Sequence, residues 1–206
     1  MTDRAAASTK RRRAAEPPSH ARLFVAVYPP APAAAHLAAF VADLAVGRAA
    51  AEGVNARLAA GPTWHVTLAF LGDVPLDRLP DVESTVGGAV REWRAAVAAP
   101  IVRLAGGGTF GRGRFTILWA GLAGDTEPLR QLSAAARRGL KRSRLPYDEK
   151  PFRPHLTLAR PGDRVDVDGD VVALRGYEGP QWNIDEVRLV RSHLGPNPRY
   201  DRLAAW

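Results

Sequence analysis

The sequence predicts an α+β fold in which the strands pair antiparallel. Apolar runs of strand length outnumber the helical segments along the 206 residues, and the two kinds of segment do not alternate evenly. A parallel doubly wound sheet needs a helix between successive strands, so this order disfavours it. With 46% hydrophobic and 24% charged residues, the chain can bury one substantial core. We therefore expect one domain over residues 21–206, and its two motif-bearing halves suggest an internal duplication.

The first half of the chain contains two expected strands and two expected helices. Residues 22–30 form an apolar strand that stops at two prolines, and Pro32 then allows a helix to begin. Residues 64–71 form the second strand, and Pro75 introduces the second helix. Both helices have apolar residues at helical spacing on one side, which indicates that they pack against a core. These residues are Leu37, Phe40, Val41 and Leu44 in the first helix, and Leu79, Val82, Val86, Val90, Trp93 and Val97 in the second.

The second half contains more strands than helices. Pro128 begins a third helix with Leu129, Leu132 and Leu140 on one side, and the basic run 137–144 covers its end. A polar segment closes the chain. The expected strands are residues 101–105, 115–122 and 155–160, followed by strands near 171–175 and 184–193.

A glycine-rich stretch from Gly106 to Gly111 formally fits the dinucleotide-binding pattern G-x-G-x-x-G. That pattern needs a strand before it and a helix after it, whereas a β-type run follows here. We therefore expect a flexible loop rather than a dinucleotide site.

Composition restricts the chemistry. The chain has no cysteine, which excludes disulfides, iron–sulfur clusters, cysteine zinc sites and a thiolate nucleophile. The net charge of +8 favours anionic partners such as nucleic acid, although a basic surface also serves solvation. Residues 1–20 are rich in Arg and Lys and poor in apolar side chains, which predicts a disordered basic tail. No apolar run of membrane-spanning or signal-peptide type occurs, so we expect a cytoplasmic protein without a membrane partner.

A repeated motif carries the strongest functional signal. His-Val-Thr-Leu-Ala begins at His65 and His-Leu-Thr-Leu-Ala begins at His155. Five histidines and nine threonines in 206 residues would produce only about 0.2 His-x-Thr triplets by chance. In a strand, residues i and i+2 lie on the same face, so each motif presents an imidazole beside a hydroxyl while the leucines face a core.

Two imidazoles suit acid–base chemistry, because their pKa values lie near neutrality and one can accept a proton while the other donates one. The hydroxyls of Thr67 and Thr157 can donate to phosphate oxygens that gain charge in a transition state. His20, His36 and His193 have neither a Thr partner nor zinc-ligand spacing, so we expect no metal. This set of groups favours cleavage of a phosphodiester.

On these residues the chain resembles the two-histidine phosphoesterase superfamily, and within it the RNA 2′,3′-cyclic phosphodiesterase family, also called 2′-5′ RNA ligase. The resemblance spans residues 21–206 and includes the segments around both motifs and the closing residues 187–206. It implies a bilobed fold with a pseudo-two-fold, in which two antiparallel sheets with flanking helices surround a central cleft. It also implies hydrolysis of a ribose 2′,3′-cyclic phosphate to a 2′-phosphate without a metal or cofactor.

The resemblance assigns roles that the spacing alone leaves open. His65 would be the proton donor, and His155 the proton acceptor that activates water. Thr67 and Thr157 would bind the phosphate, Arg160 could pair with it, and Phe24 could line a base pocket. For Arg160 a surface charge, and for Phe24 a place in the core, are the alternatives. Relatives often have an Arg before the strand that ends at Trp119, whereas this chain has Thr116, with Arg112 and Arg114 displaced into the loop.

Three hypotheses follow for the function. The first is a cyclic phosphodiesterase that acts on RNA ends or small cyclic nucleotides, with the monomer as the default state. The second is the reverse reaction, a 2′-5′ RNA ligase in which an RNA hydroxyl replaces water. The third is a nucleotide- or RNA-binding module without catalysis, which the two intact motifs disfavour.

Overall fold

Eight strands form one antiparallel sheet in the computed structural model, which describes residues 19–195 and 198–206. The strand order is β6-β3-β4-β5-β2-β1-β7-β8. The strands are β1 (His20–Val27), β2 (Val66–Pro75), β3 (Ile101–Phe110), β4 (Ile117–Gly124), β5 (His155–Ala159), β6 (Glu178–Asn183), β7 (Arg188–His193) and β8 (Arg199–Ala205). The expected α+β class with antiparallel pairing is confirmed.

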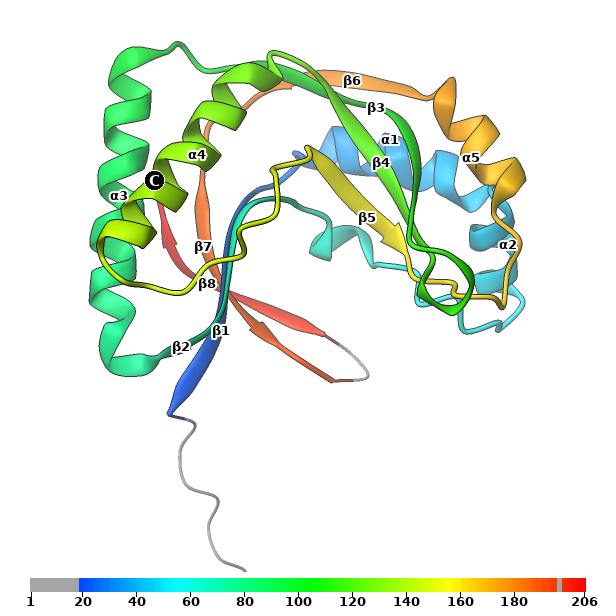
Figure 1. The fold of residues 1–206 in the computed structure, drawn as a ribbon. Helices are drawn as coiled ribbons and strands as arrows, with labels where there is room; N and C mark the ends of the chain where they lie inside the picture. Colours follow the sequence, from blue (N-terminus) through cyan, green and yellow to red (C-terminus); the bar gives the residue numbers. More distant parts are fainter. Residues whose placement is uncertain (1–18, 196–197) are drawn as a thin grey trace, which may run out of the picture.

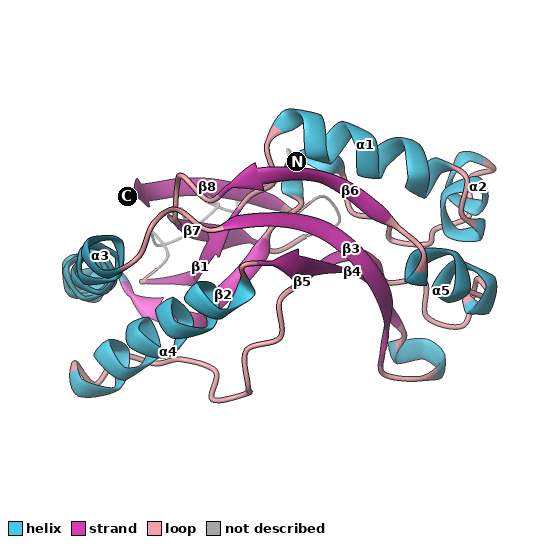
Figure 2. Ribbon diagram, turned by 90° about the horizontal axis from the view of Figure 1, so that it is seen from above, coloured by secondary structure: helices cyan, strands magenta, loops and turns pink. Residues whose placement is uncertain are grey.

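Five α-helices and three short 3-10 turns complete the described part of the chain. The helices are α1 (Ala31–Ala42), α2 (Ala45–Ala51), α3 (Leu79–Ala96), α4 (Thr126–Arg142) and α5 (Asp168–Arg175), and the turns are η1 (Gly61–Thr63), η2 (Leu76–Arg78) and η3 (Gly113–Phe115). Helix α4 packs on β2 and on α3, whereas α1 packs on β6 and α5 on β3. Figure 1 and Figure 2 accordingly show α3 and α4 beside one half of the sheet and α1, α2 and α5 beside the other.

The two expected sheets meet edge to edge. Strands β6, β3, β4 and β5 form one half of the sheet, and β2, β1, β7 and β8 form the other. The halves are joined where β2 pairs with β5, with Val66 opposite Leu156. Each half therefore has four strands with its motif strand innermost, which is the expected pseudo-two-fold arrangement.

The main core lies under the helices, on one face of the sheet. Alternate residues of β1 and β2 face it, including Leu23, Val25, Val66 and Leu68, all of which are buried. The other face carries a small separate cluster around Phe24 and Val190, with Tyr28, Phe70 and Tyr200 packed against it. Because successive side chains of a strand point to opposite faces, this small cluster lies on the face of β1 and β7 opposite the main core.

Several expected boundaries need correction. The predicted strand near 171–175 is wrong, because these residues belong to α5. In that helix Leu174 is fully buried while Val172 is 65% exposed, and the neighbouring valines had suggested a strand. Strand β8 occupies the end of the chain that was expected to be only polar, and α2 was not expected. The predicted strand 184–193 is shorter, because β7 begins at Arg188.

The expected flexible glycine loop is also wrong, since Gly106 to Gly108 belong to β3. Gly107 lies opposite Ala120 and Gly108 opposite Trp119. A Cβ atom at Gly107 would come within 2.6 Å of the Trp119 carbonyl oxygen, so β4 passes too closely for a side chain there.

Most of the expected N-terminal tail lies outside the described residues, which begin at Ser19. His20, placed in the tail by the sequence, is already the first residue of β1 and lies opposite Pro75. Among the described residues no single helix is long and apolar enough to cross a membrane, and only α1 and α2 taken together, bent by 82°, have the length and composition.

Candidate active site

The two motifs take up the strand conformation that the sequence predicts. His65 immediately precedes β2, and His155 is the first residue of β5. The imidazoles and the hydroxyls of Thr67 and Thr157 are partly buried. The apolar residues between them are at most 2% exposed, namely Val66, Leu68, Leu156 and Leu158. Each motif strand is therefore anchored on one face and open on the other.

The register between the motif strands brings their polar groups together. Val66 in β2 lies opposite Leu156 in β5 in an antiparallel pair. One step in either direction sets His65 across from Thr157 and Thr67 across from His155. The four side chains thus gather around one point on the face of the sheet opposite the main core.

Both imidazoles are held in the same way. The Nδ1 atom of His65 lies 2.7 Å from the carbonyl oxygen of Thr63, two residues earlier in the chain. The Nδ1 atom of His155 lies 2.7 Å from the carbonyl oxygen of Arg153, again two residues earlier. A carbonyl oxygen only accepts, so in both rings Nδ1 carries the proton and donates it. Nε2 is then the nitrogen left to exchange a proton with a ligand.

Aromatic rings enclose His65. Phe24 stacks on the imidazole with ring centroids 4.6 Å apart, Tyr200 meets it edge-on at 5.3 Å, and Tyr28 lies at 5.7 Å. Burial lowers the pKa of His65, the hydrogen bond to Thr63 opposes this, and the charge on His155 lowers the pKa further. Burial also raises the pKa of Tyr28 to about 12, so its hydroxyl keeps its proton.

His155 is enclosed by aromatic residues of the other half of the sheet. The edge of Phe110 in β3 meets its ring at 4.9 Å, and Trp119 in β4 lies at 6.3 Å. The two aromatic rings stack on each other at 5.1 Å. Gly121 in β4 lies opposite His155, and the absence of a side chain there lets the carbonyl oxygen of Ala105 approach closely.

A cavity of about 510 Å³ is lined by Thr67 of the first motif and His155 of the second, whereas His65 and Thr157 do not line it. Its wall carries three cations, Arg137, Lys150 and Arg153, and one carboxylate, Asp148. Two of the cations are already engaged: the Arg137 guanidinium donates to the Asp148 carbonyl oxygen at 2.9 Å, and the Lys150 ammonium lies 3.4 Å from the Asp148 carboxylate. The charge balance of this cavity suits an anion.

Sequence reasoning missed these three cations as site residues. Arg137 belongs to the basic run 137–144, and no sequence pattern singled out Lys150 or Arg153. Arg153 stands two residues before His155, and its guanidinium lies 5.7 Å from the centre of the Phe110 ring. Its place two residues before His155 in the sequence is the signal that could have identified Arg153.

Of the two other expected site residues, Phe24 lies beside His65 and Arg160 lies at the surface. Phe24 is 4% exposed, yet it belongs to the small cluster on the face that carries His65 rather than to the main core. Arg160 is exposed just after β5, and its backbone N–H donates to the Arg57 carbonyl oxygen at 3.2 Å. Arg114 stacks on Phe115 in the connection between β3 and β4. The structure therefore brings Phe24 to His65 and leaves Arg160 at the surface.

Among residues 19–195 and 198–206, no three His, Asp or Glu side chains come together as a metal ion would require. The expectation that the chemistry needs no metal stays a prediction.

The protein has an α+β fold with one antiparallel sheet, and the two His-x-Thr strands meet where the halves of that sheet join. This arrangement defines the class of two-histidine phosphoesterases. The family model of the 2′-5′ RNA ligase superfamily matches residues 29–196. The chain belongs to this superfamily.

Two curated relatives carry the same name. An RNA 2′,3′-cyclic phosphodiesterase of Geobacillus stearothermophilus is 31% identical over 147 residues, and one of Thermus thermophilus is 34% identical over 142 residues. The matches cover 69% and 64% of this chain, but only 45% and 65% of the relatives. The chain thus spans less than two thirds of either relative.

Solved structures share the fold over nearly the whole described chain. Escherichia coli LigT without ligand superposes with a TM-score of 0.67 at 23% identity, covering 92% of this chain and 98% of LigT. The protein TT0787 of Thermus thermophilus has a TM-score of 0.64 at 27% identity, covering 90% of this chain and 96% of TT0787.

Proposed function

We propose that this protein hydrolyses the 2′,3′-cyclic phosphate of RNA ends or small nucleotides to a 2′-phosphomonoester, without a metal or cofactor. The observation that carries the proposal is the matched pair of imidazoles. Each is held through Nδ1 by a carbonyl oxygen and keeps Nε2 for proton transfer, and the two flank one strand junction. The two curated relatives named RNA 2′,3′-cyclic phosphodiesterase support the choice of substrate.

In this reaction each histidine moves one proton. His155 Nε2 accepts a proton from water as the water oxygen bonds to phosphorus. The bond between phosphorus and O3′ breaks, and His65 Nε2 gives its proton to O3′. The products are a 2′-phosphate and a free 3′-hydroxyl, and proton exchange with solvent resets both rings. Thr67 and Thr157 donate hydrogen bonds to the nonbridging oxygens, where negative charge grows.

The proton donor must gain its proton on substrate binding. Because burial lowers the pKa of His65, this ring is mainly neutral in the free protein at neutral pH. An anionic phosphodiester beside it raises that pKa, since opposite charges favour the protonated form. The stacked ring of Phe24 holds the imidazole in place during this change. Arg153 and Lys150 line the cavity on the side of His155 and attract the anionic substrate.

One observation favours a second activity at the same site. The cavity beside His155 is about 510 Å³ and basic, which is far more room than a water molecule needs. An RNA hydroxyl could take the place of water there, which would join the strands through a 2′-5′ linkage. In either direction we propose that the protein works as a monomer in the cytoplasm, as a single bilobed domain over residues 21–206, with Arg160 approaching the phosphate only when substrate is bound.

The test is hydrolysis of RNA that ends in a 2′,3′-cyclic phosphate, with excess chelator present and with chromatography that separates 2′- from 3′-phosphate ends. We expect turnover in chelator and only the 2′-phosphate. A 3′-phosphate product, or activity that chelator abolishes and metal restores, would contradict the proposal. Tight RNA binding without any turnover would instead support a binding module.

A further inference from the structure

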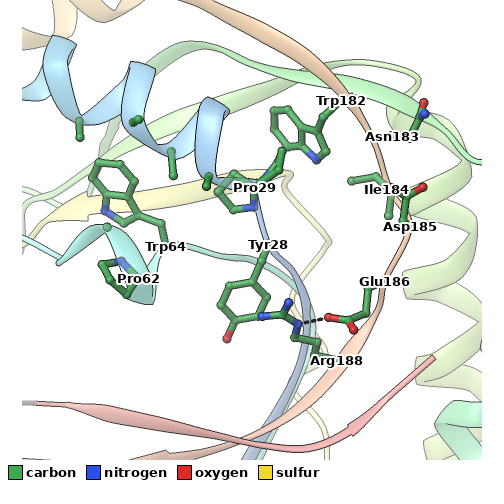
Figure 3. Close-up of a pocket in the computed structure, with 16 residues that line it drawn as sticks. Tyr28, Pro29, Pro62, Trp64, Trp182, Asn183, Ile184, Asp185, Glu186 and Arg188 are labelled. Atoms are coloured by element: carbon green, nitrogen blue, oxygen red, sulfur yellow. Dashed lines mark hydrogen bonds and ion pairs between the residues drawn. The ribbon is translucent and has the colours of Figure 1, made fainter.

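A second cavity, of about 620 Å³, lies next to the site but contains neither histidine. We call it the Tyr28 cavity, because Tyr28 lines it and also contacts His65 with ring centroids 5.7 Å apart. It opens between α1, η1 and the segment that joins β6 to β7 (Figure 3). The size is within the range of pockets that bind small ligands.

Flat apolar surfaces dominate its walls. Trp64, just after η1, and Trp182 in β6 both line the cavity, and Figure 3 shows them on opposite sides of Pro29. Tyr28 lies below them in the same view, with the Arg188 guanidinium 4.6 Å from the centre of its ring. Trp64 is only 4% exposed, so the partly buried rings of Trp182 and Tyr28 are the ones that a ligand can reach. Such rings stack on nucleobases whatever the base sequence, because every base has a π-face.

The charges of the Tyr28 cavity leave no cation for a phosphate. Arg188, its one cation among the described residues, is paired with Glu186, and Asp185 adds a second carboxylate. The cavity that contains His155 has three cations against one carboxylate. The two cavities therefore differ in the ligand group they suit, an anion beside His155 and a flat uncharged group beside Tyr28.

The positions of the two cavities relative to the histidines indicate which part of an RNA end each cavity would bind. Thr67 and His155 line the basic cavity, which therefore receives the phosphate and the water that His155 activates. In-line attack then places O3′ and the terminal nucleoside on the side of His65. The Tyr28 cavity begins one aromatic ring away from His65. We propose that it binds the next nucleobase of the RNA, the one that precedes the terminal nucleotide. This inference rests on the proposed function, and it makes an oligonucleotide a better substrate than a mononucleotide.

The experiment compares kcat/KM for a dinucleotide that ends in a 2′,3′-cyclic phosphate with kcat/KM for the matching cyclic mononucleotide. We expect the native protein to favour the dinucleotide by about tenfold, which is about 1.4 kcal/mol and within the range for stacking of one base. Equal efficiency on both substrates would overturn this inference and leave the proposed function intact. Failure to hydrolyse either substrate would overturn both.

Variants on one helix locate the effect. Ala35 lines the Tyr28 cavity from an exposed position of α1, so Ala35→Phe fills the cavity without entering the core. Ala39 is also exposed on α1 but does not line the cavity, which makes Ala39→Phe a matched control. We expect Ala35→Phe to remove the preference for the dinucleotide and Ala39→Phe to keep it. An unchanged preference in Ala35→Phe would contradict the assignment.

A second pair of variants tests the stacking itself. The indole Nε1 of Trp182 is buried without a hydrogen-bond partner among the described residues, so Trp182→Phe keeps an aromatic face and breaks no hydrogen bond. We expect Trp182→Phe to retain the preference and Trp182→Ala to lose it. Loss in both variants to the same degree, with unchanged melting temperatures, would show that stacking on this ring is not the cause.

Discussion

Val66 and Leu156 face each other across the junction of the two halves of the sheet. Their pairing places the residues on either side of them, which are the two imidazoles and the two threonine hydroxyls, around one point. Both side chains are at most 1% exposed, so the junction is anchored in the core. A single backbone pairing thus brings together groups that are far apart in the chain.

The ring tautomers are the first testable consequence. Because the Thr63 and Arg153 carbonyl oxygens accept from Nδ1, we expect both neutral rings to carry their proton on Nδ1. Long-range ¹H–¹⁵N NMR spectra of the ligand-free protein distinguish the two tautomers. Protonation on Nε2 in either ring would contradict the assigned proton path.

The lowered pKa of His65 is the second testable consequence. Burial, and then the charge on His155, lower it below the ordinary value near 6.5. The unfolded chain therefore binds this proton more readily than the folded protein does. The contribution of His65 to the free energy of unfolding is complete above pH 6.5 and falls as the pH drops toward the lowered pKa. NMR titration measures the pKa directly, and we expect Phe24→Ala to raise it by letting water reach the ring. Titration of His65 above 6.5 in the native protein would be inconsistent with this environment.

The threonine hydroxyls offer a third test. Replacing Thr67 or Thr157 by Val keeps the branched shape that a strand favours but removes the donor. We expect kcat to fall by about 10²-fold for each replacement, as for other donors to a developing negative charge. Thr67→Ser and Thr157→Ser keep a hydroxyl and should retain most activity. Equal loss in the Val and Ser variants would indicate that these positions matter for packing alone.

A fourth prediction concerns stability away from the site. The Asp170 carboxylate is 3% exposed and accepts hydrogen bonds from the backbone N–H groups of Ala45 and Val46, at 2.6 and 3.0 Å. These are orphan donors at the start of α2, where Leu44 provides no side-chain cap. We expect Asp170→Ala to lower the free energy of unfolding by about 3 kcal/mol in urea titrations.

Asp168 is the matched control for that change. It lies on the same helix α5 but is exposed, so Asp168→Ala should cost only a few tenths of a kcal/mol. Similar losses in the two variants would mean that the buried carboxylate does not hold α2.

The sequence predicts the elements whose hydrophobic period is regular. The strands at His65 and His155 and the helix after Pro128 follow from alternation and from helical spacing, and the structure confirms them. The strand predicted at Val171 is wrong, because two adjacent β-branched residues suggest a strand although both lie on a helix and one of them is exposed. The flexible loop predicted from Gly106 is wrong, because its glycines accommodate the close approach of Trp119 in a neighbouring strand. No local sequence pattern reveals that tertiary contact.

The candidate site also contains residues that the sequence predicts and residues that only the fold brings together. The four motif residues follow from spacing alone, since residues i and i+2 share a strand face. The cavity cations Arg137 and Lys150 lie on a helix and in a connector, and only the fold brings them beside Thr67. Tyr28 reaches His65 through the pairing of β1 with β2, and Tyr200 reaches it through the pairing of β1 with β7 and of β7 with β8. No local sequence pattern encodes these pairings.

The division of labour between His65 and His155 is the central claim, and a change of leaving atom tests it most directly. Rates of His65→Ala and His155→Ala are compared on a 2′,3′-cyclic phosphate and on its analogue with sulfur at the 3′ bridging position. On the oxygen substrate we expect each variant to lose about 10²- to 10⁴-fold. A thiolate leaves without protonation, so on the sulfur analogue His65→Ala should recover most of its loss while His155→Ala should not. Unchanged turnover of the oxygen substrate in either variant, or recovery by His155→Ala in place of His65→Ala, would contradict the account.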